Sequence, residues 1–280
     1  MPRSRVVLLT TLAMLAFAGN SLLCRLALAG TAIDAGTFTT VRIVSGALTL
    51  WVIVQFRRVA GGLAGDWASA LALFAYAAGF SLAYIDLSAA TGALLLFGAV
   101  QATMISYAFW KGDRLRGWQV VGFACAVLGL VALLFPGLSA PPLHSAALMV
   151  IAGIAWGIYS LRGRGAGDPT AATAGNFVRA VPFTAALSLA MMSQFSVDAA
   201  GISYAIASGA LTSGLGYAIW YTALKQSRAT SAATVQLSVP VIATIGGVLL
   251  LAEHVTVRIV IASVAILGGI ALVILNRARV

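Results

Sequence analysis

The sequence has few charged residues and very few acids. Only 9% of its 280 residues are charged, with 7 aspartates and glutamates against 17 lysines and arginines, whereas 61% are hydrophobic. The mean hydropathy is +1.01, and ordinary soluble domains are only roughly 45 to 50% apolar. This composition excludes an ordinary soluble domain and predicts an all-α polytopic membrane protein.

Residue types that serve catalysis or bind metals are also scarce. The two histidines, His144 and His254, fall in polar breaks far apart in the sequence, and Cys24 and Cys125 lie in separate apolar segments. Neither pair has partners at metal-ligand or disulfide spacing. A phosphate loop of the form GxxxxGK[ST] is absent, which argues against ATP as a direct energy source. We therefore expect no cofactor, no metal and no enzymatic activity.

Polar breaks divide the chain into apolar segments of about 20 residues, the length that a bilayer core requires. The predicted spans are 6–28, 35–56, 67–86, 89–110, 116–135, 143–162, 171–195, 202–224, 231–251 and 256–276. A cleavable signal peptide is the alternative for the first span, because Ala27, Leu28 and Ala29 precede Gly30. Asn20 and Arg25 lie too close to that cleavage site, which favours a first spanning helix.

The basic residues are spread over short breaks, so the net charge of +10 indicates membrane topology and not a nucleic-acid partner. Most of them fall in alternate breaks: Arg3, Arg5, Arg57, Arg58, Lys111, Arg114, Arg116, Arg162, Arg164, Lys225, Arg228, Arg277 and Arg279. The positive-inside rule then predicts that both termini are cytoplasmic. We expect a monomer in the cell inner membrane, whose partners are lipid and a small-molecule substrate.

The chain also matches itself at an offset of about 137 to 140 positions. The matched pairs are Arg42 with Arg179, Phe80 with Tyr217, Tyr84 with Tyr221, Asp113 with Glu253 and Gly129 with Gly269. Each copy holds five predicted spans, an odd number, so the second copy enters the membrane from the opposite side. This predicts two inverted five-helix repeats, 1–138 and 139–280, around a central cavity, an architecture typical of secondary transporters.

Several residues make the chain similar to the EamA-like ten-helix branch of the drug/metabolite transporter superfamily. They are Trp156-Gly157, Arg42, Arg179, Val239-Pro240-Val241, Glu253 and Gly268-Gly269. The stretch YIDLSAATGALLLFGAVQATM resembles the YddG-type members, which implies export of aromatic and other neutral amino acids. The first half departs from the second, with Val100 in place of Pro240 and Lys111-Gly112-Asp113 in place of an end that contains glutamate.

Two arginines lie inside predicted spans, where an arginine costs about 2.5 to 3.5 kcal/mol on insertion scales and has to face the bundle or water. Arg42 and Arg179 are therefore candidate substrate-binding residues. The alternative is that each one binds backbone carbonyls or fixes helix register. Their equivalent positions in the two repeats favour this structural role.

Aromatic residues form the main set of candidate cavity residues. Tyr76, Phe80 and Tyr84 share a helix face, and the other members are Trp156, Tyr159, Tyr217 and Tyr221. Aromatic rings with polar tips suit a ring-containing substrate or an organic cation. An interfacial aromatic belt is the alternative, and it applies best to Tyr84 and Tyr221, which lie close to span ends.

Amide side chains within spans have to point away from lipid. Asn20, Gln101, Asn176 and Gln236 are such residues, and Asn20 and Gln236 are the stronger candidates for substrate binding. Contacts between helices are the alternative role. Pro182 and Pro240 interrupt spans and are expected to kink them.

These patterns together predict a secondary transporter that exports amino acids or similar amphiphilic metabolites by alternating access. Efflux of cationic or lipophilic drugs is the alternative, and a membrane enzyme or lipid-handling protein is a remote one. Every acid lies at a break or span end: Asp34, Asp66, Asp86, Asp113, Asp168, Asp198 and Glu253. Many proton-coupled carriers use a carboxylate within the membrane, so we expect facilitated export.

Overall fold

The computed structural model describes residues 3–58, 62–112, 117–135, 140–163, 167–224 and 234–277. The expected boundary between residues 138 and 139 lies outside these ranges. So do several residues of the charge and repeat arguments, namely Asp113, Arg114, Arg116, Arg164, Lys225, Arg228 and Arg279.

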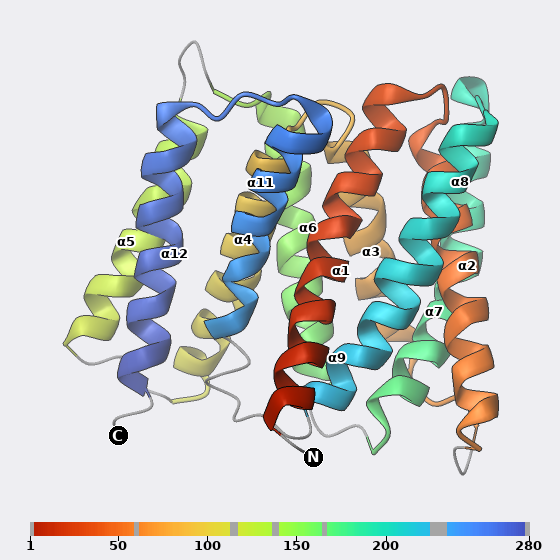
Figure 1. The fold of residues 1–280 in the computed structure, drawn as a ribbon, viewed down its shortest axis with the longest axis horizontal. Coiled ribbons are helices and arrows are strands. Elements are labelled where there is room, and N and C mark those ends of the chain that lie inside the picture. The colour runs from red at the N-terminus through yellow and green to blue at the C-terminus, as the bar shows by residue number, and fades with distance from the viewer. Residues whose placement is uncertain are drawn as a thin grey trace.

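Within the described ranges the fold is a bundle of helices without strands (Figure 1). The first six helices are α1 (Arg3–Gly30), α2 (Ala35–Phe56), α3 (Trp67–Ala83), α4 (Ala89–Trp110), α5 (Trp118–Leu134) and α6 (Leu143–Arg162). They are followed by α7 (Pro169–Ala190), the short 3-10 helix η1 (Met192–Gln194), α8 (Ala199–Ala207), the π-helix η2 (Ser208–Leu215), α9 (Gly216–Leu224), α11 (Ser238–Leu251) and α12 (Val257–Arg277). Because α8, η2 and α9 follow one another without a gap, they form one segment, and the described chain crosses the bundle ten times.

Six of the described helices are long and apolar enough to cross a membrane, and α3 and α5 are shorter apolar helices. Large apolar side chains are exposed on the outer faces of the bundle, for example Leu128 on α5 and Val264 on α12. In lipid such faces need no further cover. The protein is therefore a multi-pass membrane protein, as the composition predicts.

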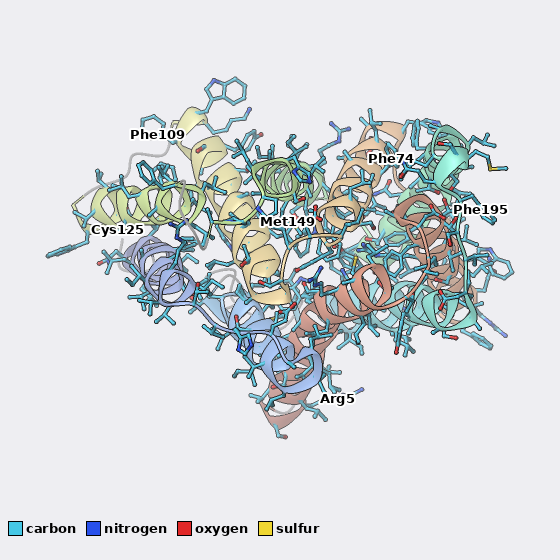
Figure 2. All side chains as sticks on the ribbon, turned by 90° about the horizontal axis from the view of Figure 1, so that it is seen from above. Arg5, Phe74, Phe109, Cys125, Met149 and Phe195 are labelled. Atoms are coloured by element: carbon cyan, nitrogen blue, oxygen red, sulfur yellow. The ribbon has the colours of Figure 1, made fainter. Side chains whose placement is uncertain are left out.

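Both termini lie at the same end of the bundle (Figure 1), which we call the terminal end; the other is the opposite end. Viewed from above, α5 and α12 lie side by side at one edge, with Cys125 on α5, and Phe195 marks the far edge (Figure 2). Met149 of α6 lies inside the bundle and is fully buried.

Acidic side chains begin four of the helices. Asp34, Asp66, Asp168 and Asp198 are the N-caps of α2, α3, α7 and α8, and each carboxylate accepts a hydrogen bond from a backbone N–H in the first turn. Such a cap satisfies an N–H group that has no partner within the helix. Most acids at the predicted breaks thus have a structural role at helix ends.

The two predicted helix interruptions differ in kind. Pro240 lies in the first turn of α11, directly after the break at Leu237 that separates α11 from the helical residues 234–236, so the predicted ninth span is interrupted beside this proline. Proline is tolerated there because first-turn N–H groups have no intrahelical partner. Pro182 does lie inside α7. The span predicted over 202–224 instead contains the π-helix η2, which hydropathy alone does not reveal.

Glycines allow α5 and α12 to approach closely. A Cβ atom added at Gly269 would lie 2.4 Å from the backbone oxygen of Gly122 and 2.8 Å from the backbone nitrogen of Ala126. Nothing lies within 4 Å of a Cβ atom added at the neighbouring Gly268. Small residues at such contacts are the usual packing solution in membranes.

This contrast gives a test of the packing. We expect Gly269→Ala to destabilise the protein by about 1 to 3 kcal/mol, the usual cost of overpacking, and to lower the melting temperature in detergent. Gly268→Ala is the matched control and should not lower it. Equal melting temperatures for the two variants would contradict the observed α5–α12 contact.

Candidate functional site

A small closed cavity lies at the centre of the bundle, between α1, α3, α4, α6, η2 and α9. Its volume is about 10 Å³, about the room that one water molecule needs. The lining residues are Phe17, Asn20, Ser21, Tyr76, Phe80, Leu96, Phe97, Trp156, Thr212, Ser213 and Tyr217. The bundle is therefore closed around a lining that is aromatic and polar, and a substrate requires the helices to separate.

Trp156 is the centre of the aromatic part of the lining. Its ring stacks on that of Tyr76, with centroids 5.2 Å apart and an interplanar angle of 26°. Phe97 and Phe17 contact Trp156 edge-on, at 5.3 Å and 6.1 Å. These geometries are the favourable ones for aromatic pairs. Four different helices thus contribute one packed group of rings.

Asn20 of α1 is the centre of the polar part. Its Nδ2 donates to the Tyr76 hydroxyl at 3.2 Å, and its Oδ1 accepts from Ser208 Oγ at 2.7 Å and from Thr212 Oγ1 at 3.3 Å. Asn20, Tyr76 and Ser208 are all buried. Since an unpaired amide in lipid is costly, this network ties α1 to α3 and η2.

Arg42 of α2 lies directly behind the cavity wall. Its side chain is fully buried, and Nη2 donates to the Tyr76 hydroxyl at 2.9 Å. The guanidinium carbon lies 4.9 Å from the centroid of the Phe80 ring and 5.2 Å from that of Tyr76. Both rings line the cavity, so the positive charge lies one ring away from it.

The π-helix η2 brings its polar side chains to this centre. Thr212 and Ser213 line the cavity, and Ser208 binds Asn20. At Gly209 an added Cβ would lie 2.1 Å from the backbone oxygen of Arg42. Only glycine permits this approach of η2 to α2. Short π-helical segments within helices are frequent at functional sites.

The opposite end of the bundle is closed by Glu253. Both carboxylate oxygens accept from the backbone N–H of Ala89, at 3.1 Å and 2.9 Å, and Arg25 Nε lies 3.3 Å from Oε1. Arg25 Nη1 also donates to the carbonyls of Tyr84 and Ile85 at 3.1 Å and 2.7 Å. This group joins α1, the α3–α4 turn and the end of α11, so we call it the opposite-end latch.

Two ion pairs close the terminal end. Arg57 Nη2 lies 2.9 Å from Asp168 Oδ2, and Arg162 Nη2 lies 2.8 Å from Asp66 Oδ1. The hydrogen bonds from Ser69, helped by Arg162, lower the pKa of Asp66 to about 2. Asp66 therefore keeps its negative charge and its partners over the physiological pH range. These pairs join the ends of α2, α3, α6 and α7.

Comparison with known proteins now places the chain. The sequence profile described as "EamA-like transporter family" matches residues 144–275. Residues 144–275 therefore form an EamA-like transporter domain.

Two relatives and one solved structure are similar to most or nearly all of the chain. An uncharacterized protein of Pseudomonas aeruginosa is 56% identical over 278 residues, which cover 99% of this chain and 97% of that protein. An "uncharacterized transporter" of Archaeoglobus fulgidus is 27% identical over 201 residues, 70% of this chain and 72% of the relative. A crystal structure of a protein aligns with a TM-score of 0.71 at 20% identity, covering 99% of this chain and 100% of that chain, and shows the fold alone.

The structure brings together six of the ten candidate residues that the sequence suggested. Asn20, Tyr76, Phe80, Trp156 and Tyr217 line the cavity, and Arg42 lies behind it. The other four candidates, Tyr84, Tyr159, Arg179 and Gln236, are not among the lining residues.

The alternative that places Tyr84 in an interfacial aromatic belt is wrong, although the residue does lie at the end of α3. Its side chain is fully buried, its ring lies edge-on to Phe80 at 4.7 Å, and its hydroxyl donates to the carbonyl of Ala89 at 3.4 Å. A Cβ atom at Gly92 would overlap this ring. The α3–α4 turn folds over Tyr84 because Gly92 leaves room for its ring. The position of Tyr84 near a span end does not reveal this burial.

Arg179 and Gln236 occupy other surroundings. Arg179 Nη1 donates to the carbonyls of Ala64 and Gly175, at 2.8 Å and 3.0 Å, and the side chain is partly exposed. This is the structural role that the sequence left open as an alternative. Gln236 is also partly exposed and directly precedes the turn at Leu237, outside the cavity lining.

Tyr159 belongs to a separate buried cluster. Its hydroxyl donates to Thr173 Oγ1 at 3.3 Å and accepts from Asn176 Nδ2 at 3.5 Å, and Thr173 donates to the Tyr221 hydroxyl at 3.2 Å. Asn176 Oδ1 in turn accepts from the backbone N–H of Asp66 at 2.9 Å. This cluster ties the terminal end together.

Sequence reasoning missed other lining residues: Phe17, Ser21, Leu96, Phe97, Thr212 and Ser213. The run SGALTSG contains a signal for this site, since three hydroxyl side chains among small residues need polar partners in lipid.

The opposite-end latch of this transporter can be tested with Cys24. This residue is fully buried in α1 beside Arg25, whereas Cys125 is exposed. In a Cys125→Ser background, we expect Glu253→Gln to raise the labelling rate of Cys24 by a polar maleimide. The increase should be roughly tenfold, because a hydrogen bond to a charged group contributes about 1.5 to 3 kcal/mol.

Arg57→Gln is the matched control, since it breaks an ion pair at the terminal end and should leave the labelling of Cys24 unchanged. Unchanged labelling in Glu253→Gln would show that this latch does not hold the opposite end closed.

Proposed function

We propose that this protein exports amino acids, aromatic or otherwise neutral, or similar small amphiphilic metabolites, by alternating access. The observation that carries the proposal is the closed central cavity, whose lining combines a packed group of rings around Trp156 with a polar network around Asn20. Pockets that combine apolar walls with a few placed polar groups bind small organic molecules.

The arrangement of the helices supports two inverted repeats. In the two repeats α1 corresponds to α6, α2 to α7, α3 to the α8–α9 segment, α4 to α11 and α5 to α12. When each helix is replaced by its counterpart, the contact of α3 with α6 becomes that of the α8–α9 segment with α1, and the contact of α4 with α6 becomes that of α11 with α1. All four contacts are observed. The pairs α2 with α7 and α5 with α12 map onto themselves. Transporters with inverted repeats bind substrate between the repeats.

The cavity lining follows the same relation. Phe17 and Trp156, Tyr76 and Ser213, and Phe80 and Tyr217 are separated by the offset that relates the two halves, and all six line the cavity. Both ends are closed by separate polar groups, the opposite-end latch and the terminal-end ion pairs. Rocking of the halves would open one end while the other remains closed.

Organic cations are the competing substrate class. A cation in a dry cavity is usually paired with a carboxylate, and among the lining residues there is none. The buried charge beside the cavity is that of Arg42, which repels cations. This favours amino acids over cationic drugs.

The proposed location is the cell inner membrane, with a monomer whose termini are both cytoplasmic. Arg57, Arg58, Lys111 and Arg162 lie near helix ends at the terminal end of the bundle. Basic residues concentrate on the cytoplasmic side of membrane proteins, so the terminal end is the cytoplasmic one in this proposal.

The cavity assignment is tested by flux in proteoliposomes. We expect Trp156→Ala and Tyr76→Ala to reduce the flux of aromatic amino acids at least roughly tenfold, equal to about 1.4 kcal/mol, because each removes a ring that faces the substrate. Trp51→Ala and Tyr107→Ala remove exposed rings and are the matched controls. Wild-type flux in both cavity variants would remove the assignment.

The mode of energy coupling is tested separately. Every described acid caps a helix or pairs with a neighbour at an end of the bundle, so the described part of the chain offers no acid within the membrane to carry protons. We expect a pH gradient across proteoliposomes to produce no concentrative uptake. Accumulation above the external concentration that collapses with a protonophore would refute facilitated export.

A further inference from the structure

The hydroxyl of Tyr76 is used as an acceptor by two groups that can only donate. Asn20 Nδ2 lies 3.2 Å and Arg42 Nη2 lies 2.9 Å from its oxygen. A phenol oxygen accepts in such bonds through its lone pairs, which leaves its own proton to be donated elsewhere. Among the described residues we find no acceptor for that proton, and Tyr76 lines the cavity.

Arg42 supplies a positive charge with unused donors at the same place. Its Nε and Nη1 are buried and have no hydrogen-bond partner among the described residues. Its charge also has no acid beside it, because the described acids lie at the two ends of the bundle, as N-caps, in the opposite-end latch or, for Asp86, in an ion pair with His144. A buried cation without a counterion is unfavourable, and a bound anion would offset that cost.

The acceptors of the network, in contrast, are already used. Asn20 Oδ1 accepts from Ser208 Oγ at 2.7 Å, whereas the single hydroxyl proton of Thr212 is shared between Asn20 Oδ1, at 3.3 Å, and the nearer Ser208 carbonyl, at 2.7 Å. All the hydrogen bonds around Asn20 therefore run towards the Tyr76 oxygen. The polar side of the cavity presents a donor with a positive charge behind it.

We propose that the cavity recognises the carboxylate of its substrate, which accepts a hydrogen bond from the Tyr76 hydroxyl and balances the charge of Arg42, whereas an ammonium group has no acidic partner there. The inference deepens the proposed function and rests on it. The substrate class then extends from amino acids to carboxylates that lack the amine and excludes amines that lack the carboxylate.

Three ligands that share a phenyl ring separate these features. L-phenylalanine carries both groups, 3-phenylpropionate only the carboxylate and 2-phenylethylamine only the ammonium. Binding to the purified protein in detergent is measured by the shift of its melting temperature with ligand concentration. We expect phenylalanine and 3-phenylpropionate to bind within about tenfold of each other, about 1.4 kcal/mol, and 2-phenylethylamine to give no shift.

Variants test the two residues directly. Tyr76→Phe keeps the ring that stacks on Trp156 and removes only the hydroxyl, so we expect it to weaken binding of 3-phenylpropionate at least about tenfold, a loss of about 1.4 kcal/mol. Arg42→Gln should weaken it further. Tyr159→Phe is the matched control, because it removes a buried hydroxyl outside the cavity, and its affinity should equal that of the wild type.

Several results would overturn the inference. They are preferential binding of 2-phenylethylamine, no binding of any of the three ligands, and wild-type affinity for 3-phenylpropionate in Tyr76→Phe. Wild-type affinity for 3-phenylpropionate in Tyr76→Phe would overturn the carboxylate site even if Arg42→Gln does not fold.

Counterflow of L-phenylalanine in proteoliposomes separates this inference from the proposed function. Carboxylate-dependent binding without flux would contradict export and support the carboxylate site. Flux that 2-phenylethylamine inhibits and 3-phenylpropionate does not would support transport and overturn the site.

Discussion

Inside a bilayer, every backbone N–H and C=O group needs a partner within the protein, because lipid offers none. The rest of this structure follows from that constraint. It forces the chain into helices, so unpaired backbone groups occur only at helix ends, and there the few acids are used. Asp34, Asp66, Asp168 and Asp198 cap helices, and Glu253 binds the first backbone N–H of α4. The acids are therefore kept away from the cavity.

The same constraint explains how the helices pack. Lipid does not drive apolar faces together, so close contact depends on small residues and on polar side chains that bind across helices. Gly122 and Gly269 bring α5 against α12, and Gly209 brings η2 against α2. The approach at Gly209 places the hydroxyls of η2 beside Asn20 and Tyr76. The close packing at Gly209 therefore also forms the polar part of the site.

At the centre, the cavity combines aromatic rings, an amide network and an arginine without an acid beside it. The rings exclude water, which makes the charge of Arg42 more effective than it would be at a surface. The polar groups that close the ends, Arg25 with Glu253 and Arg57 with Asp168, are more exposed and closer to water. Exposed ion pairs are weak, so they suit contacts that would have to break and re-form in the proposed alternating access.

Much of the fold could be predicted from the sequence, because helix spans in lipid depend on local hydropathy and length. The helical membrane class and the similarity to EamA-like transporters were confirmed, and the described helix boundaries mostly agree within a few residues. The π-helix η2 could not be predicted this way, and neither could Leu237 as the residue at which the helix breaks before Pro240. Both depend on which hydrogen bonds the neighbouring helices complete.

By itself the sequence determined that Asn20 and Arg42 cannot face lipid, and it made Tyr76 and Trp156 candidates for the cavity. Only the tertiary structure decided what each of them meets. Arg42 and Arg179 occupy equivalent positions in the sequence, yet one is buried against Tyr76 and the other binds the carbonyl of Ala64. Tyr84 is buried because Gly92 leaves room for its ring. Hydropathy reports the cost of lipid exposure, whereas the partner of a buried group depends on contacts between residues far apart in the chain.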